Sequence, residues 1–194
     1  MATGSGANSG RDGDSVQGST RAEGWSRLPV DQLIRELIRT RREATPDETA
    51  QIIERIATAP FDARVVSAPT YLRGLMYGER TVQTHDESAF LHLVKCVLEE
   101  RQWADGTTVA DYVEDLRRAV RHPGARVALY AGRSGPIAAT VSNTDMAVPE
   151  RRRGEKTLSF LIVIYSVDRG VIITGYQFSD LSTVRIPKEA LWLR

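Results

Sequence analysis

The chain is poor in cysteine, histidine and lysine, and each shortage argues against particular kinds of protein or site. Its single thiol, Cys96, cannot form a disulfide within the chain, which excludes a disulfide-stabilised scaffold and favours a reducing cytoplasm. Three histidines and one cysteine leave few ligands for a metal. His85 and His92 stand two helical turns apart, too far to share one ion. We therefore expect a cytoplasmic protein without a metal or another cofactor.

Long apolar runs are also missing. The longest, residues 160–165, is far too short to cross a bilayer, and the N-terminus lacks the apolar core of a secretory signal. We therefore expect no membrane partner. Residues 132–135 (Gly-Arg-Ser-Gly) do not match a phosphate-binding P-loop, and no serine stands in a nucleophile elbow.

The charged residues are nearly balanced, with a formal net charge of +1 at pH 7. Residues 101–194 hold a small excess of cations, and most cations are arginines, because lysine occurs only at positions 95, 156 and 188. The planar guanidinium suits bidentate contacts to phosphate, so this pattern favours an anionic partner. An ordinary mixed-charge surface and a genomic bias toward arginine explain the same pattern.

Composition divides the chain into three parts. Residues 1–24 are mostly small or polar, so they cannot bury enough apolar surface to offset the entropy of ordering, and we expect a disordered tail. Residues 25–83 are expected to form a helical N-terminal region. Residues 84–194 are expected to form an α+β domain.

Two amphipathic helices are expected at 30–43 and 46–58. The second begins with Thr45-Pro46, and Glu48 completes a capping box. We expect a helical hairpin with a structural or partner-docking role. A helix-turn-helix that reads DNA fits less well, because both helices are only mildly basic and the turn lacks glycine.

Two more helices are expected before the pattern changes to strands. The first covers 84–103, where a periodicity of about 100° per residue places Arg101 on the apolar face and His92 on the opposite face. The second begins at Thr107 or Thr108 and ends at the Pro123-Gly124 stop signal.

From residue 125 the apolar period is two, which is typical of strands. We expect strands at 126–130, 136–141, 158–165 and 171–178, a short edge strand at 184–186, and a hairpin turn at 168–170. Helices followed by a run of strands predict an α+β fold, in which helices pack on one face of a small antiparallel sheet.

A possible catalytic site begins with Thr174 and Tyr176, which alternation places on one face of the last long strand. Polar groups among Val171, Ile172 and Ile173 need partners or a function. His122 follows a helix and Arg126 begins a strand, so these four side chains are candidate catalytic groups. In every case a structural role is the alternative: a helix-end residue, a cross-strand pair or a core aromatic.

Such groups suit metal-free RNA cleavage. Histidine serves as acid or base near neutral pH, arginine stabilises the charge on the phosphorane, and tyrosine stacks a base or donates a hydrogen bond. The helix dipole favours protonated His122, which suits an acid slightly better than a base. Further side chains are candidates for binding the substrate: Arg101, Tyr130, Arg151, Arg152 and Arg153. A solvated loop is the alternative for the three consecutive arginines.

A helix, then strands that carry arginine, then a strand of the form Ile-Ile-Thr-Gly-Tyr176 resembles the barnase–EndoU–colicin–RelE superfamily of small ribonucleases. The resemblance covers about residues 84–180 and departs in net charge, since members are often strongly basic. It implies an endoribonuclease, a bacterial toxin domain and a protein inhibitor or antitoxin as partner. The hypothesis from another class is a non-catalytic α+β binding or regulatory protein. The two differ in whether His122, Arg126, Thr174 and Tyr176 converge in one pocket.

Overall fold

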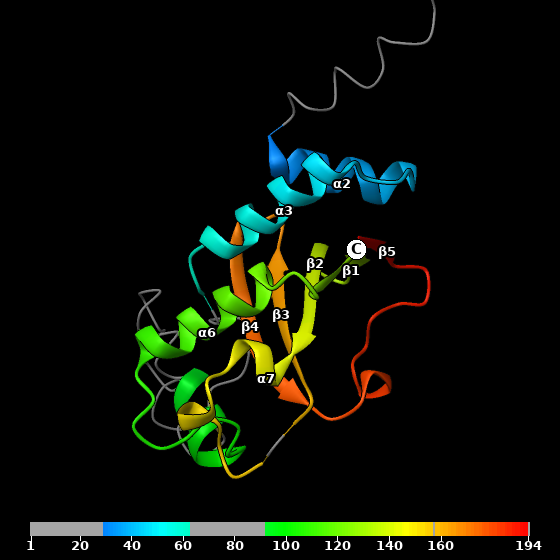
Figure 1. Ribbon diagram of the computed structural model, residues 1–194. Helices are drawn as coiled ribbons and strands as arrows, with labels where there is room; N and C mark the ends of the chain where they lie inside the picture. The colour runs from blue at the N-terminus through cyan, green and yellow to red at the C-terminus, as the bar shows by residue number, and fades with distance from the viewer. Residues whose placement is uncertain (1–28, 63–91, 157, 194) are drawn as a thin grey trace, which may run out of the picture.

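The computed structural model describes residues 29–62, 92–156 and 158–193 (Figure 1). The expected tail at 1–24, most of the stretch 60–83 and the N-terminal part of the helix expected at 84–103 lie outside the described residues. Within the described ranges, no helix is long and apolar enough to cross a membrane.

Three helices confirm the sequence predictions, and two of them begin with capping boxes. They are α2 (Val30–Thr40), α3 (Pro46–Thr58) and α6 (Val109–Arg121). At the start of α3, Thr45 Oγ1 accepts from the Glu48 N–H (3.2 Å), and the Glu48 carboxylate accepts from the Thr45 N–H (2.8 Å). Thr108 and Asp111 repeat the arrangement at α6. Each box satisfies two backbone donors that the first helical turn leaves without partners.

The helix expected to run to residue 103 ends earlier and turns differently. Its last described turn is η1 (Lys95–Glu99), a π-helix, and Arg101 has a left-handed φ of 51°. The wider turn changes the rotation per residue, so Arg101, which follows it, departs from the face expected for it. His92 is buried, whereas the Arg101 side chain is 61 % exposed, which is the reverse of our expectation.

Five antiparallel strands form one sheet in the order β4-β3-β2-β1-β5. They are β1 (Arg126–Gly132), β2 (Gly135–Asn143), β3 (Phe160–Ser166), β4 (Val171–Phe178) and β5 (Leu191–Leu193). The first four strands, and the hairpin at Gly170 with its positive φ of 67°, confirm the sequence predictions. With helices packed against this sheet, the protein has an α+β fold.

The prediction of a short edge strand at 184–186 is wrong. After η3 (Leu181–Thr183), Val184 and Ile186 pack against the apolar side chains of the sheet without joining it. Their alternation therefore reflects burial against a surface and not strand pairing. Residues 179–190, which we call the strap, connect β4 to β5 on the opposite edge of the sheet (Figure 1). Between β2 and β3 the chain holds two short helices, α7 (Thr144–Ala147) and η2 (Glu150–Arg152).

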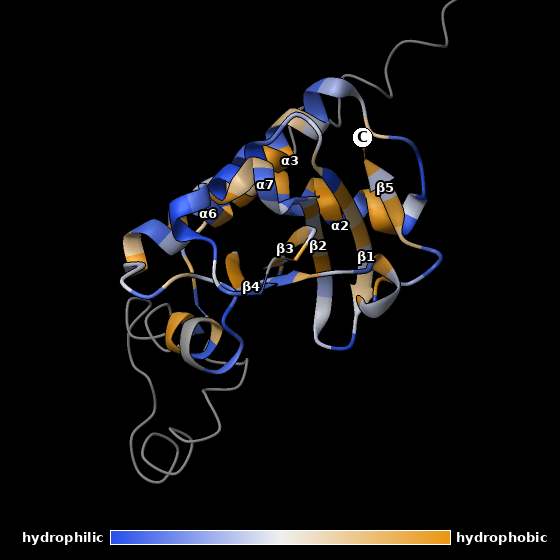
Figure 2. Ribbon diagram, turned by 60° about the horizontal axis from the view of Figure 1, so that its bottom comes forward, coloured by the Kyte–Doolittle hydropathy of each residue, from blue (hydrophilic) through white to orange (hydrophobic). Residues whose placement is uncertain are grey.

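The sheet divides the core into two apolar clusters. On one face, side chains of α2, α3 and α6 pack against inward residues of the strands, among them Leu129, Leu161 and Tyr165. Figure 2 shows that apolar residues are concentrated in the strands. The other face, which we call the strap-side face, carries a smaller cluster that includes Ile162 and Phe178.

The helices α2 and α3 share the larger core with the sheet. Their apolar residues Leu33, Leu37 and Ile56 are at most 1 % exposed. Arg55 pairs with Asp31 (2.8 Å), and Asp31 accepts a hydrogen bond from Tyr165 of β3 (2.6 Å). A docking role for residues 30–58 stays a prediction. Because the apolar faces of α2 and α3 are buried in the core, a partner would have to contact their polar faces.

Replacing Ile162 by alanine is expected to lower the free energy of unfolding by about 2–5 kcal/mol. Ile162 is fully buried at the centre of the strap-side cluster, so truncation removes apolar contacts and leaves a cavity. Urea denaturation measures the loss. Met146→Ala is the control, because Met146 is 56 % exposed and surface substitutions change stability by about 0.5 kcal/mol or less. A similar loss for both variants would show that the strap-side face is not a packed core.

Candidate functional site

The strap-side face carries several of the side chains that the sequence singled out. Cross-strand pairing places Arg126, Val141, Ile162 and Tyr176 in one row, from β1 across β2 and β3 to β4. Thr174 stands in the neighbouring row, opposite Ile164. The expectation that Thr174 and Tyr176 share a face is therefore confirmed.

The row also sets how far apart these groups lie. Three strand spacings of about 4.8 Å separate the backbones of Arg126 and Tyr176 by about 14 Å. The two side chains are therefore on one surface, but their backbone positions are too far apart for one compact acid–base site. The structure does not bring His122, Arg126, Thr174 and Tyr176 into one pocket.

Aromatic side chains surround this row. Phe160 and Phe178 stack with ring centroids 5.4 Å apart, and Tyr176 meets Phe178 edge-on at 6.4 Å. Tyr130, Tyr176 and Phe160 are half-buried. Burial raises the pKa of Tyr130, with a smaller contribution from the neighbouring Tyr176, and burial also raises the pKa of Tyr176. Both phenols therefore stay protonated near neutral pH.

Arg126 stands at the edge of a small pocket on this face. Its guanidinium lies 4.3 Å from the centroid of the Trp192 ring on β5, a cation–π contact. Among the residues that the structure describes, Arg126 forms no ion pair with a carboxylate. The pocket has a volume of about 130 Å³, and its lining comes from the start of β1, the end of β2, β3, the strap and β5: Gly124, Arg126, Val141, Ser142, Asn143, Phe160, Leu181 and Trp192.

His122 lies beside this pocket along the chain. It is the C-cap of α6, and its Nδ1 accepts a hydrogen bond from the Gly124 N–H (3.0 Å). An accepting Nδ1 places the proton of the neutral imidazole on Nε2, so the ring presents a donor at its far end. Gly124 also lines the pocket, and a Cβ there would stand 3.2 Å from the His122 ring.

Thr174 belongs to a different group of residues, at the edge of β4. His92 Nε2 donates to the carbonyl oxygen of Gly175 (3.0 Å) and lies 3.2 Å from Thr174 Oγ1. Tyr112 from α6 donates to the same Gly175 oxygen (2.8 Å). The side chain of Gln102 exchanges hydrogen bonds with the backbone of Gln177. The contacts of His92, Tyr112 and Gln102 satisfy backbone groups of an edge strand, so His92 has a structural role, and the Thr174 hydroxyl lies against it.

Residue 175 is glycine because α6 passes close to this edge. A Cβ at Gly175 would lie 2.4 Å from Leu116 Cδ2. The glycine at the centre of the Thr-Gly-Tyr motif is therefore explained by the packing of α6 against β4. His92 was expected on the outward face of its helix, but it is buried. In the sequence, its burial is indicated by its position one helical turn before Cys96, which is also buried. Burial raises the pKa of the Cys96 thiol and makes it a poor nucleophile.

Stability is expected to fall between about pH 7 and pH 5 because of His92. Burial lowers the pKa of His92 from 6.5 to about 4. Within this pH range the unfolded chain binds a proton that the folded protein does not, so acid favours unfolding. The expected loss over this range is about 2 kcal/mol.

Urea denaturation at several pH values tests this expectation. A His92→Asn variant is the control, because it lacks the titrating group and should lose correspondingly less stability on acidification. An identical pH dependence in both proteins would contradict a buried, neutral His92.

The arginines expected to bind substrate are mostly engaged within the protein. Arg152 is buried and donates to Asp115, which is fully buried, and to Asp111 (2.9 Å). The hydrogen bond with Asp115 raises the pKa of the Arg152 guanidinium, so it stays charged. Arg153 donates to the carbonyl oxygen of Val148 (2.9 Å) and pairs with Asp145.

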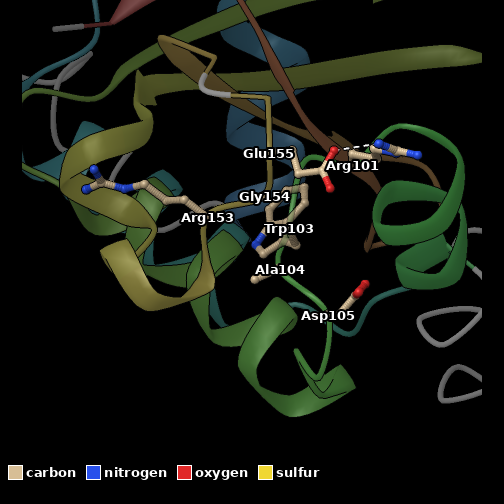
Figure 3. A pocket seen from close by; sticks show the side chains of 7 residues that line it. All are labelled: Arg101, Trp103, Ala104, Asp105, Arg153, Gly154 and Glu155. Atoms are coloured by element: carbon tan, nitrogen blue, oxygen red, sulfur yellow. Dashed lines mark hydrogen bonds and ion pairs between the residues drawn. The ribbon is translucent and has the colours of Figure 1, made fainter.

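A second pocket, of about 350 Å³, lies next to this loop. Arg101 reaches Glu155 there (2.5 Å), and Figure 3 shows Arg153 pointing away from that pair. Arg101 and Arg153 are therefore held by carboxylates or carbonyls, and of the three consecutive arginines only Arg151 is exposed to solvent.

No group of three or more His, Cys, Asp or Glu side chains that could hold a metal ion occurs within residues 29–62, 92–156 and 158–193. Comparisons with protein-family models, curated proteins and solved structures find no match. The functional argument therefore depends on the geometry of the chain itself.

Proposed function

We propose that this protein binds single-stranded RNA on the strap-side face of its sheet. The observation that carries the proposal is the cation–π contact of Arg126 with Trp192, on the face of the sheet that also carries the half-buried rings of Tyr130, Phe160 and Tyr176. Aromatic rings on a sheet stack bases, while a nearby arginine contacts the phosphate between them.

The dimensions of the face suit a strand of RNA and not a single small ligand. Arg126 and Tyr176 lie about 14 Å apart along the row, as three strand spacings require. Stacked nucleotides rise about 3.4 Å each, so about four nucleotides span the row. Helices α2 and α6 cover the opposite face. On the strap-side face Val184 and Ile186 of the strap pack against the buried centre, so the strand would contact the half-buried rings around this centre.

The net charge of +1 argues for few phosphate contacts. Each phosphate neutralised on a single strand changes the slope of log Kobs against log[salt] by about 0.7. We therefore expect a shallow slope in the intact protein, and a slope about 0.7 shallower still after Arg126→Ala.

Tyr176→Ala is expected to weaken binding by about 1–3 kcal/mol, the value of one base–aromatic stack. Fluorescence anisotropy with labelled single-stranded RNA measures the affinity. Tyr176→Phe is the matched control, because it keeps the ring, loses only the hydroxyl and should bind almost as well as the wild type. Equal affinities for all three proteins would exclude Tyr176 as a stacking residue.

RNA cleavage without metal is the second candidate function. It is favoured by the position of His122, whose Nδ1 is held by Gly124 and whose Nε2 stays available as a donor, next to the pocket that Arg126 lines. In this proposal water takes the proton of the attacking 2′-OH, and Arg126 stabilises negative charge on the phosphorane. His122 acts as the imidazolium, with Nδ1 protonated instead of accepting from Gly124, and gives its Nε2 proton to the leaving 5′-oxygen. Thr174 has no part in it, because its hydroxyl lies against His92 at the far edge of the sheet.

A further inference from the structure

We propose that the strap is a displaceable cover of the strap-side face, and that RNA spans this face only when the strap has lifted from the sheet. The inference rests on the RNA-binding function proposed above and adds a conformational step that regulates it. It follows from what the strap covers and from what holds the strap in place.

The strap covers apolar side chains that no described helix covers. Within the described residues, every member of the strap-side cluster lies on a strand, except Val184, Ile186 and Ala190, which belong to the strap. Ala128 and Ala139 pair across β1 and β2, and both are fully buried although their side chains are small. Such small side chains make room for the strap above the middle of the sheet.

The strap is held by apolar contact and not by hydrogen bonds to the sheet. Its backbone hydrogen bonds are local, such as the one from the Thr183 N–H to the Asp180 carbonyl oxygen (3.0 Å). Within the part of the chain that the structure describes, none of residues 180–189 forms a hydrogen bond or an ion pair with a strand. Contact through the half-buried Val184 and Ile186 therefore holds the strap in place. Segments with few buried apolar contacts open locally at a low cost in free energy.

The strap packs against the centre of the row that is proposed to bind RNA. Arg126 at one end of the row is exposed, and Tyr176 at the other end is half-buried. Val141 and Ile162, which lie between them, are buried in the cluster that the strap covers. A strand of RNA that reaches both ends of the row must cross this centre. The strap and the RNA therefore compete for it, and lifting the strap joins the two ends into one surface.

A cover of this kind lowers the apparent affinity for RNA in proportion to the fraction of molecules in which the strap is open. Replacing both Val184 and Ile186 by alanine removes apolar contact from the closed state and so raises the open fraction. We expect this double variant to bind single-stranded RNA roughly 10-fold more tightly than the wild type. Val113→Ala is the matched control, because Val113 is a half-buried valine of α6 that packs against the other cluster. It should leave the affinity unchanged.

Two measurements on the full-length protein test the inference. Fluorescence anisotropy with a labelled single-stranded RNA of mixed sequence gives the affinities of the wild type and both variants. Trypsin cleavage after Arg185, identified by mass spectrometry, follows the lifted strap, because Arg185 is exposed between the two anchoring side chains. Cleavage at this bond should be faster in the double variant than in the wild type or Val113→Ala. Saturating RNA should also speed it in the wild type.

The outcomes separate this inference from the function on which it rests. RNA binding by the double variant that is no tighter than in the wild type would overturn the inference and leave the RNA-binding function standing. Slower cleavage after Arg185 with RNA bound would do the same, because the strap would then close over the RNA. Binding by the double variant alone would support both proposals. If neither protein binds RNA, the RNA-binding function is wrong, and the inference fails with it. Circular dichroism and thermal unfolding of each variant exclude a loss of fold as the cause.

Discussion

Asp115→Ala is expected to destabilise the protein by about 3–5 kcal/mol. Asp115 is fully buried and accepts hydrogen bonds from Arg152 on two atoms and from Trp103 Nε1 (3.2 Å). Without the carboxylate, the Arg152 guanidinium keeps Asp111 but loses both of its bonds to Asp115, and the buried indole N–H loses its acceptor. Removing the buried partner of a buried charge costs far more than a surface pair contributes.

Urea denaturation of Asp115→Ala and Glu114→Ala measures this difference. Glu114 is adjacent in the chain, is exposed and lies 4.0 Å from Arg118, so its removal is expected to cost at most about 1 kcal/mol. A loss below about 1 kcal/mol for Asp115→Ala would contradict a structural role for Arg152. Arg152 would then again be a candidate for phosphate binding.

His122→Ala is expected to slow RNA cleavage by roughly 10²–10⁴-fold, the contribution of one acid–base group. The basis is the half-buried imidazole beside the Arg126 pocket, which serves as the acid when its Nδ1 is protonated instead of accepting from the Gly124 N–H. The assay uses a labelled RNA pool, purified protein and EDTA, and resolves products with a 2′,3′-cyclic phosphate end.

Thr174→Val is the matched comparison for cleavage. Thr174 lies at the edge of β4 against His92, so this variant should lose some stability and keep its cleavage rate. If the wild type cuts nothing, the protein is a binding protein without catalysis. Thr174→Val could instead lose cleavage as strongly as His122→Ala while it stays folded. That result would show that the catalytic site extends to β4, which contradicts a site confined to the start of β1.

Elements with local signals were predictable from the sequence. Both described capping boxes depend on residues three positions apart, and the hairpin at Gly170 depends on one glycine with a positive φ. The four long strands follow from alternation. By contrast, β5 has three residues and pairs with β1, more than sixty positions away, so no local pattern marks it. The π-helical turn before Arg101 likewise has no signal in the apolar period.

The candidate site was predictable only in part. Alternation correctly placed Thr174 and Tyr176 on one face. Convergence of β1 and β4 was not justified, because consecutive hairpins place these strands three positions apart unless the sheet closes into a barrel. The partners of Arg152 and His92 depend on contacts 37 and 83 positions away, which no single-chain pattern specifies.

Photo-crosslinking of single-stranded RNA to the full-length protein, with the modified peptides mapped by mass spectrometry, tests the central claim most directly. Binding on the strap-side face predicts crosslinks at its aromatic residues Tyr130, Phe160, Tyr176 and Trp192, and their loss when unlabelled RNA competes. Crosslinks confined to α2, α3 or α6, on the opposite face of the sheet, would contradict it.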